Sequence, residues 1–170
     1  MTITRTLAML AGAALATAVA AEEITDPGKE TVARVTVNVL LATNGDATVA
    51  GERSRPVPAT TESRLRAEKR LRFGHYRLLG DSHRRVYRSY ENWSQPLAPS
   101  DEVLVRFEAQ GKPRDKKQRL DIDLWLSRKK ILKTNAVVGT DCPLFILGPE
   151  WRGGRLIIML ALAPEPPVGQ

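Results

Sequence analysis

The sequence predicts a mostly β fold of the α+β class, an antiparallel sheet or sandwich of about seven to eight strands with one helix after the first strand. Three observations predict this class. Apolar and polar residues alternate in several segments, turn-forming residues separate these segments, and one stretch between them is rich in helix-forming residues. Of the 170 residues, 42% are hydrophobic and 26% are charged, a composition typical of a chain with a packed core.

Three segments alternate between apolar and polar side chains, which is typical of half-buried strands. In residues 33–41, Leu41 and three valines share one face, while the polar side chains share the other. The same period of two recurs in residues 103–109 and in residues 120–127. A Gly-Lys-Pro sequence and a charged run stand between these two later segments, so we expect them to form a hairpin.

Two further segments are almost entirely apolar, residues 144–147 and residues 156–162. Runs of this kind are typical of central strands that are covered on both faces. For the last segment, the edge of a dimer is the alternative. Three more strands are expected at residues 75–79, 85–93 and 131–138.

One segment lacks the alternation and predicts a helix over residues 61–73. It is rich in Arg, Glu, Leu, Ala and Lys, which are good helix formers. Hydroxyl side chains at residues 60–63 offer caps for its N-terminus. Leu65 and Leu71 supply a weak apolar stripe, and Gly74 is suited to end the helix.

The first residues have the three-part layout of a secretory signal peptide. Arg5 supplies a positive charge, residues 7–15 are rich in Ala and Leu, and residues 18–20 fit the small-x-small cleavage pattern. The apolar run is shorter than the roughly 20 residues that a membrane-spanning helix needs, and retention of the leader as an anchor is the alternative. The sequence thus predicts a signal peptide over 1–20, a single β-rich domain over 21–163 and a flexible Pro-rich tail over 164–170.

The predicted mature chain points to the periplasm or to the cell exterior. The Ala-rich leader is typical of bacterial export, and no transmembrane span is expected after processing. The sequence holds one Cys, so an internal disulfide is excluded. A lone cysteine fits an oxidising compartment when it is buried or paired between chains. We expect Cys142 to be buried, because an apolar run follows it.

Five segments carry a resemblance that covers most of the mature chain: VTVNVLLATN, RLRFGHYRLL, LAPSDEVLVRF, LDIDLWL and GRLIIMLAL. In their hydrophobic spacing they are similar to small uncharacterised exported proteins of bacteria that are rich in β-structure. The resemblance implies export and a compact β-rich fold. It has no catalytic signature and implies no activity.

The chain is basic, with 26 Lys and Arg against 19 Asp and Glu, and much of the positive charge lies near aromatic residues between Arg53 and Trp93. Guanidinium groups form paired hydrogen bonds with phosphates or carboxylates, and flat rings stack on bases or sugars. One interpretation is therefore a polyanion-binding surface. The other is a solvated helix face followed by strands whose rings fill the core. The candidate polyanion-binding residues are Arg64, Arg66, Arg70, Arg72, Arg77, Arg84, Arg85, Arg88, Tyr87 and Tyr90.

A second basic stretch, from Lys112 to Lys133, spans two expected hairpin turns. Consecutive turns usually fall at opposite ends of a sheet, which argues against one charged rim, and charged turns also protect sheet edges without binding anything. Within this stretch Asp121 and Asp123 fall on one strand face. Cross-strand salt bridges are a more common role for such a pair than metal binding or acid–base catalysis.

The sequence contains none of the common catalytic or nucleotide-binding motifs. His75 and His83 flank a predicted turn at residues 80–82 that contains Asp81, and these three residues leave a small hydrolase as an alternative. Neighbours in a turn rarely converge as a catalytic site requires, so a polar hairpin is the simpler interpretation. We interpret the protein as an exported, non-enzymatic binding or structural domain of the bacterial envelope. We expect an envelope protein or an acidic polymer as its partner, and neither a cofactor nor a metal.

Overall fold

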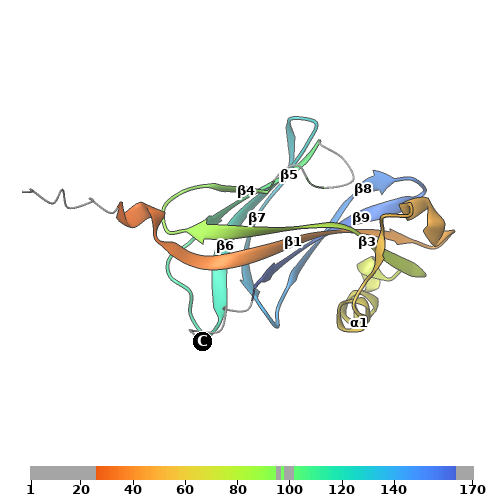
Figure 1. Cartoon of the computed structure of the whole chain (residues 1–170), viewed down its shortest axis with the longest axis horizontal. Helices are drawn as coiled ribbons and strands as arrows, with labels where there is room; N and C mark the ends of the chain where they lie inside the picture. The colour runs from red at the N-terminus through yellow and green to blue at the C-terminus, as the bar shows by residue number, and fades with distance from the viewer. Residues whose placement is uncertain (1–25, 95–96, 98–101, 164–170) are drawn as a thin grey trace, which may run out of the picture.

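The computed structural model describes residues 26–94, 97 and 102–163, so the predicted leader over 1–20 and tail over 164–170 lie outside the described part. Two antiparallel sheets make up most of the described chain (Figure 1), which confirms the predicted mostly β class. One sheet has the order β2-β3-β1-β9-β8 and the other β4-β5-β6-β7. The strands are β1 (Thr31–Thr43), β2 (Arg55–Pro56), β3 (His75–Tyr87), β4 (Asn92–Ser94), β5 (Val103–Ala109), β6 (Lys117–Leu126), β7 (Lys129–Gly139), β8 (Leu144–Trp151) and β9 (Gly154–Leu162).

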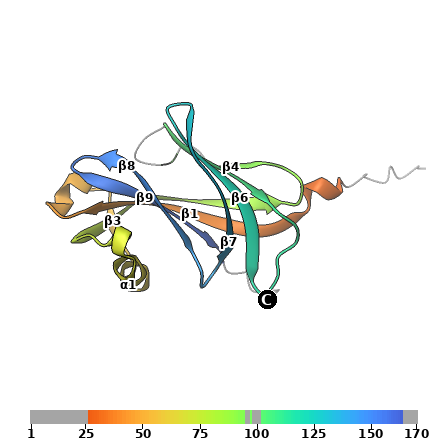
Figure 2. The same cartoon turned by 180° about the vertical axis from the view of Figure 1, so that it is seen from behind.

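The two sheets face each other across the main hydrophobic core (Figure 2). The alternation of β1 directs Val35 and Val37 into this core, where both are completely buried. The facing sheet contributes Phe107 from β5 and Ile122 from β6, also completely buried. Each such side chain stabilises the folded state by about 1.5–3 kcal/mol relative to an exposed position, so the period of two in the sequence fixes which face of each strand is inside.

Strand β9 lies in the middle of the five-stranded sheet, between β1 and β8. Ile158 belongs to the core between the sheets, whereas Ile157 belongs to a second cluster on the other face, so the prediction of a central strand covered on both faces is confirmed. The same prediction for residues 144–147 is wrong. Strand β8 is an edge strand, and its Leu147 is 37% exposed.

The helix is shorter than the predicted range of 61–73. Helix α1 spans Ala59–Ala67, and after Glu68 a separate 3₁₀ turn, η3, spans Lys69–Leu71. Pro58 is the N-cap and no side chain caps the helix, so the expected hydroxyl caps are absent here. Leu65 and Leu71 are buried, as predicted, in the second cluster, which covers one end of the outer face of the five-stranded sheet. No helix in the described ranges is long and apolar enough to cross a membrane.

Strand β3 runs without a break through the predicted turn at residues 80–82, so the prediction of two strands joined by that turn is wrong. Its partner β1 pairs with it from end to end. The register shifts between Val39, opposite Gly80, and Leu40, opposite Leu78. The extra residue, Leu79, therefore forms a bulge, which accommodates the Gly80 region without ending the strand.

The hairpin turns are charged and tight. The turns before and after β6 contain the left-handed residue pairs Asp115-Lys116 and Ser127-Arg128, respectively. Because β6 separates them, the two basic turns lie at opposite ends of the four-stranded sheet and form no common rim. The loop between β7 and β8 carries Cys142, which is exposed, so the prediction of a buried thiol is wrong.

Candidate functional site

The ten residues proposed from the sequence fall into two groups at opposite ends of β3 (Figure 1). Helix α1 packs against the start of β3 through Leu65 and Tyr76. Arg77 and Tyr87 of β3 are about 30 Å apart along the extended strand, so one compact surface does not contain both groups. The group near α1 comprises Arg64, Arg66, Arg70, Arg72 and Arg77, and the far group comprises Arg84, Arg85, Tyr87, Arg88 and Tyr90.

Three arginines of the group near α1 hold the local structure together. Arg66 donates to Glu62 at 2.7 Å and to the carbonyl oxygens of Phe73 and Gly74 at 3.0 and 2.9 Å. Its guanidinium also lies 5.3 Å from the centre of the Tyr76 ring. Arg72 donates to the carbonyl oxygen of Arg66, and Arg77 to that of Ser54. Each of these three guanidinium groups therefore already has a hydrogen-bond partner within the fold. Arg64 and Arg70 are exposed.

In the far group, two side chains are engaged with acidic residues. Arg88 forms an ion pair with Glu30 at 2.5 Å. The hydroxyl of Tyr90 donates to Asp26 at 2.5 Å, and this bond raises the pKa of Tyr90. Asp26 in turn has a lowered pKa, because the Tyr90 hydroxyl and then the backbone amide of Gly28 donate to it. Tyr90 thus acts as a tether to the segment before β1.

Arg85 forms a pair that sequence reasoning did not find. It lies directly opposite Arg34 of β1 in the antiparallel register, so both side chains belong to the outer face of the sheet. Both residues are exposed, and among the described residues neither guanidinium has an ion-pair partner. The alternation of residues 33–41 placed Arg34 on a polar face. It did not reveal that β3 would bring a second arginine beside it.

The Arg34–Arg85 pair is flanked by an open hollow of about 340 Å³ along the edge of β3. Beyond the short pairing with β2, no further strand of the described residues pairs with this edge. The hollow therefore leaves donor groups accessible beside Arg85. Its lining consists of His83, Arg84, Arg85, Tyr87, Glu91 and Asn92.

The next rung of the same face carries a chain of polar contacts. Thr36 Oγ1 lies 3.1 Å from Nδ1 of His83, and Nε2 of His83 lies 3.3 Å from Asp81. Asp81 also pairs with Arg55 of β2. His75 is about 25 Å away at the start of the strand, so the structure brings Asp81 and His83 together but leaves His75 apart. The His83 side chain is 69% exposed, and the chain of contacts lies on an open sheet surface.

The outer face of the four-stranded sheet carries a dense ion-pair network. Arg106 of β5 binds Glu91 at 2.6 Å, Glu108 at 2.8 Å and Asp123 at 3.2 Å. Burial raises the pKa of Asp123, but the hydrogen bond and charge of Lys130, together with Arg106, outweigh it and lower the pKa overall. For the pair Asp121 and Asp123, the sequence predicts cross-strand salt bridges, and this prediction is confirmed for Asp123. The other acid, Asp121, instead accepts hydrogen bonds from two amide side chains.

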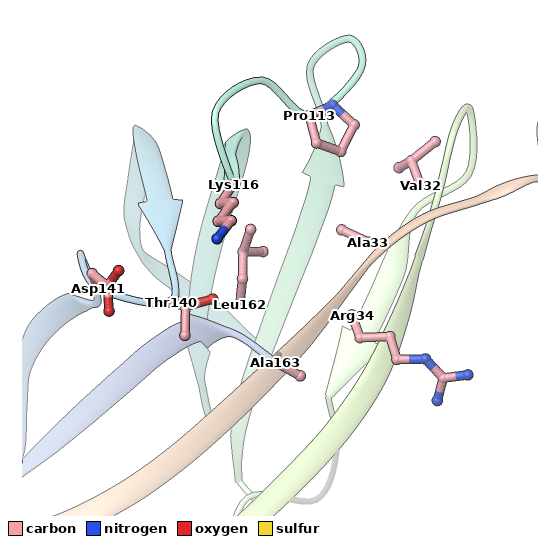
Figure 3. A pocket seen from close by; sticks show the side chains of 9 residues that line it. All are labelled: Val32, Ala33, Arg34, Pro113, Lys116, Thr140, Asp141, Leu162 and Ala163. Carbon is pink, nitrogen blue, oxygen red and sulfur yellow. The ribbon is translucent and has the colours of Figure 1, made fainter. Parts of the chain in front are cut away.

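A cavity opens between the two sheets at the ends of β1 and β9 (Figure 3). Its volume is about 440 Å³. Residues of β1, the end of β9 and the connections before β6 and β8 line it. In the described part of the chain, no three His, Cys, Asp or Glu side chains are grouped so as to hold a metal ion.

The chain matches no family model, no curated protein and no solved structure. The resemblance to exported bacterial proteins therefore stays a prediction, and the function has to be argued from the surface of this chain alone.

Proposed function

We propose that the protein is an exported, non-enzymatic binding domain of the bacterial envelope that binds an anionic group of an acidic polymer at the Arg34–Arg85 pair. The leader supports export, and the pair supports the ligand class. Two like charges directly opposite each other on neighbouring strands are destabilising. An anion placed between the guanidinium groups removes this repulsion and gains charge-assisted hydrogen bonds.

The surroundings of the pair favour an extended anion over a single small ion. His83 lies on the next rung of the same face, and Arg84 and Tyr87 line the hollow beside Arg85. Tyr87 therefore offers a further hydroxyl on one side of the pair, while both ring nitrogens of His83 on the other side already contact Thr36 and Asp81. The hollow is open, which suits a polymer that passes across the surface without being enclosed.

A salt titration with a short DNA duplex as the model polyanion tests the site. We expect the double variant Arg34→Gln/Arg85→Gln to bind at least several-fold more weakly, and its log–log salt slope to be smaller by about 2. The matched control is Arg64→Gln/Arg70→Gln, which removes the same charge at the other end of β3. Equal losses in both variants would show that only net charge attracts the duplex and would contradict the site.

Export is tested separately by mass spectrometry of the protein recovered from the periplasmic fraction of its bacterial host. We expect an N-terminus close to Ala21. A chain that keeps its first residues and stays in the cytosol would contradict the envelope location but would leave the anion-binding surface standing.

A small hydrolase is the second candidate, because Thr36, His83 and Asp81 form a hydroxyl–imidazole–carboxylate chain. In such a reaction Thr36 Oγ1 would bond to an ester carbonyl carbon while His83 accepts the hydroxyl proton. The alcohol would leave with that proton as its C–O bond breaks, and water would then release the acid from the acyl-threonine. The exposure of His83 favours the binding function over this one.

A further inference from the structure

The cavity between the sheets combines an apolar wall with a single inward-facing ammonium group. Val32 and Ala33 line it from β1, Leu162 and Ala163 from the end of β9, and Pro113 from the turn before β6. Leu162 is buried at the cavity floor, whereas Pro113 is exposed at its rim. A volume of about 440 Å³ falls in the range of pockets that bind small molecules.

Lys116 supplies the positive charge of the cavity. It lies in a two-residue turn with a left-handed backbone (φ 58°), closed by hydrogen bonds between Arg114 and Lys117 at both ends. This turn fixes the direction of the Cα–Cβ bond of Lys116, whose side chain is exposed. In Figure 3 the ammonium group is directed toward Thr140 and Leu162. No described residue forms an ion pair with it.

The other charged residues at the cavity do not place a positive charge inside it. The guanidinium of Arg34 is directed away from the cavity, to the outer face of the sheet (Figure 3). Asp141 lies beyond Thr140, at the edge opposite to β1. A ligand that fills the apolar part therefore meets one cation, Lys116, and approaches one anion only at the rim.

We infer that this cavity binds a medium-chain aliphatic carboxylate, with its hydrocarbon chain against Leu162 and its carboxylate on Lys116. Contact with the apolar wall removes hydrocarbon surface from water. The ammonium forms a charge-assisted hydrogen bond that an uncharged head group of the same length does not provide. Arg34 contributes to the lining, but its guanidinium is directed to the outer face of the sheet, so the ligand in the cavity and the ligand at the Arg34–Arg85 pair contact different groups.

Calorimetric titration with octanoate, and with 1-octanol as its uncharged counterpart, tests the assignment. We expect octanoate to bind the full chain roughly tenfold more tightly than octanol. Lys116→Gln should reduce the affinity for octanoate to that for octanol. Lys112→Gln, in the same connection between β5 and β6 but outside the cavity lining, should leave both affinities unchanged.

Two further variants distinguish binding in the cavity from binding elsewhere on the surface. Ala163→Trp places a large ring at the rim and should abolish binding of both probes. Asp141→Asn removes the opposing carboxylate and should strengthen octanoate binding about two- to threefold without changing octanol binding. Thermal unfolding of each variant checks that the fold is retained.

Equal binding of octanoate and octanol, equal losses in Lys116→Gln and Lys112→Gln, or undiminished binding by folded Ala163→Trp would each overturn the inference. The single variant Arg85→Gln should bind octanoate normally, because Arg85 lies outside the cavity lining. Failure of the DNA titration and failure of the octanoate titration are therefore independent results.

Discussion

The ammonium group of Lys130 lies 2.8 Å from Oδ2 of Asp123, a carboxylate whose side chain is only 3% exposed. The same oxygen accepts from Arg106 at 3.2 Å. Since Arg106, Asp123 and Lys130 belong to β5, β6 and β7, the contact joins three strands of the four-stranded sheet on its outer face. The ammonium group of Lys130 also lies 5.1 Å from the centre of the Trp125 ring.

Asp123→Asn should lower the free energy of unfolding by about 1–3 kcal/mol, because two cationic partners lose their counter-charge in a largely buried position. Urea unfolding followed by circular dichroism measures this change. Asp121→Asn on the same strand face is the control. Its carboxylate accepts only from the amides of Gln110 and Asn135, so its loss should be smaller. Equal effects at both positions would mean that the ion pairs of Asp123 contribute no more than the amide hydrogen bonds of Asp121.

The contribution of Asp123 should depend on pH in a defined direction. Its pKa is lower in the folded state than its ordinary value. The carboxylate therefore stabilises the fold above the ordinary pKa, and this stabilisation is lost as the pH falls through the lowered pKa. We expect the gap between wild type and Asp123→Asn to be full at neutral pH and to shrink as the pH falls below the ordinary pKa of the group. A gap that is constant with pH would contradict the assignment.

Gly154→Ala should destabilise the protein by about 1–3 kcal/mol, since the added methyl group has no room. A Cβ at this position would lie 2.6 Å from the carbonyl oxygen of Ala42 and 2.8 Å from Leu41. Gly45→Ala is the matched control, because its nearest contact would be an ordinary 3.7 Å to Thr43. Differential scanning calorimetry of both variants measures the difference. A stable Gly154→Ala protein would show that β1 and β9 separate easily at this end.

Tyr90→Phe should raise the pKa of Asp26 toward its ordinary value. The hydroxyl hydrogen bond is the largest of the effects that lower this pKa, and the bond from Gly28 remains in the variant. Carboxyl chemical shifts in an NMR pH titration measure the change. Tyr87→Phe removes a hydroxyl from the same region and should leave Asp26 unaffected. An unchanged Asp26 in Tyr90→Phe would mean that the tether does not persist in solution.

Local patterns in the sequence were enough to predict the strands that are covered by the core. Strands β1, β5 and β6 alternate because one face of each is buried, and β9 is apolar throughout because it is covered on both faces. The predicted range of helix α1 extends too far toward the C-terminus, and the structure gives the physical reason. The sequence continues to favour helix after Ala67, but Glu68 adopts an extended conformation, and the chain then turns so that Leu71 enters the second cluster.

Local sequence patterns do not predict which distant strands pair with each other. Gly80, Asp81 and Ser82 are typical turn residues, and only pairing with the long strand β1 keeps them in β3. The Arg34–Arg85 pair and the Thr36–His83 contact depend on the same pairing, so neither is visible in the sequence. In the sequence, the arginines near α1 and those of the far group belong to one continuous basic stretch, and nothing in that stretch distinguishes them. Their separation from the far group follows from the length of β3.

The contact between Thr36 and His83 gives a test that separates the two proposed functions. If the chain hydrolyses esters, His83→Gln and Thr36→Val should each reduce the rate at least about 100-fold, because the base or the nucleophile is lost. His75→Gln should leave the rate unchanged, since His75 lies at the far end of β3. Release of nitrophenol from a panel of nitrophenyl esters measures the activity. A wild-type rate equal to that of Thr36→Val on every ester would remove the hydrolase and leave the polar chain as part of the anion-binding face.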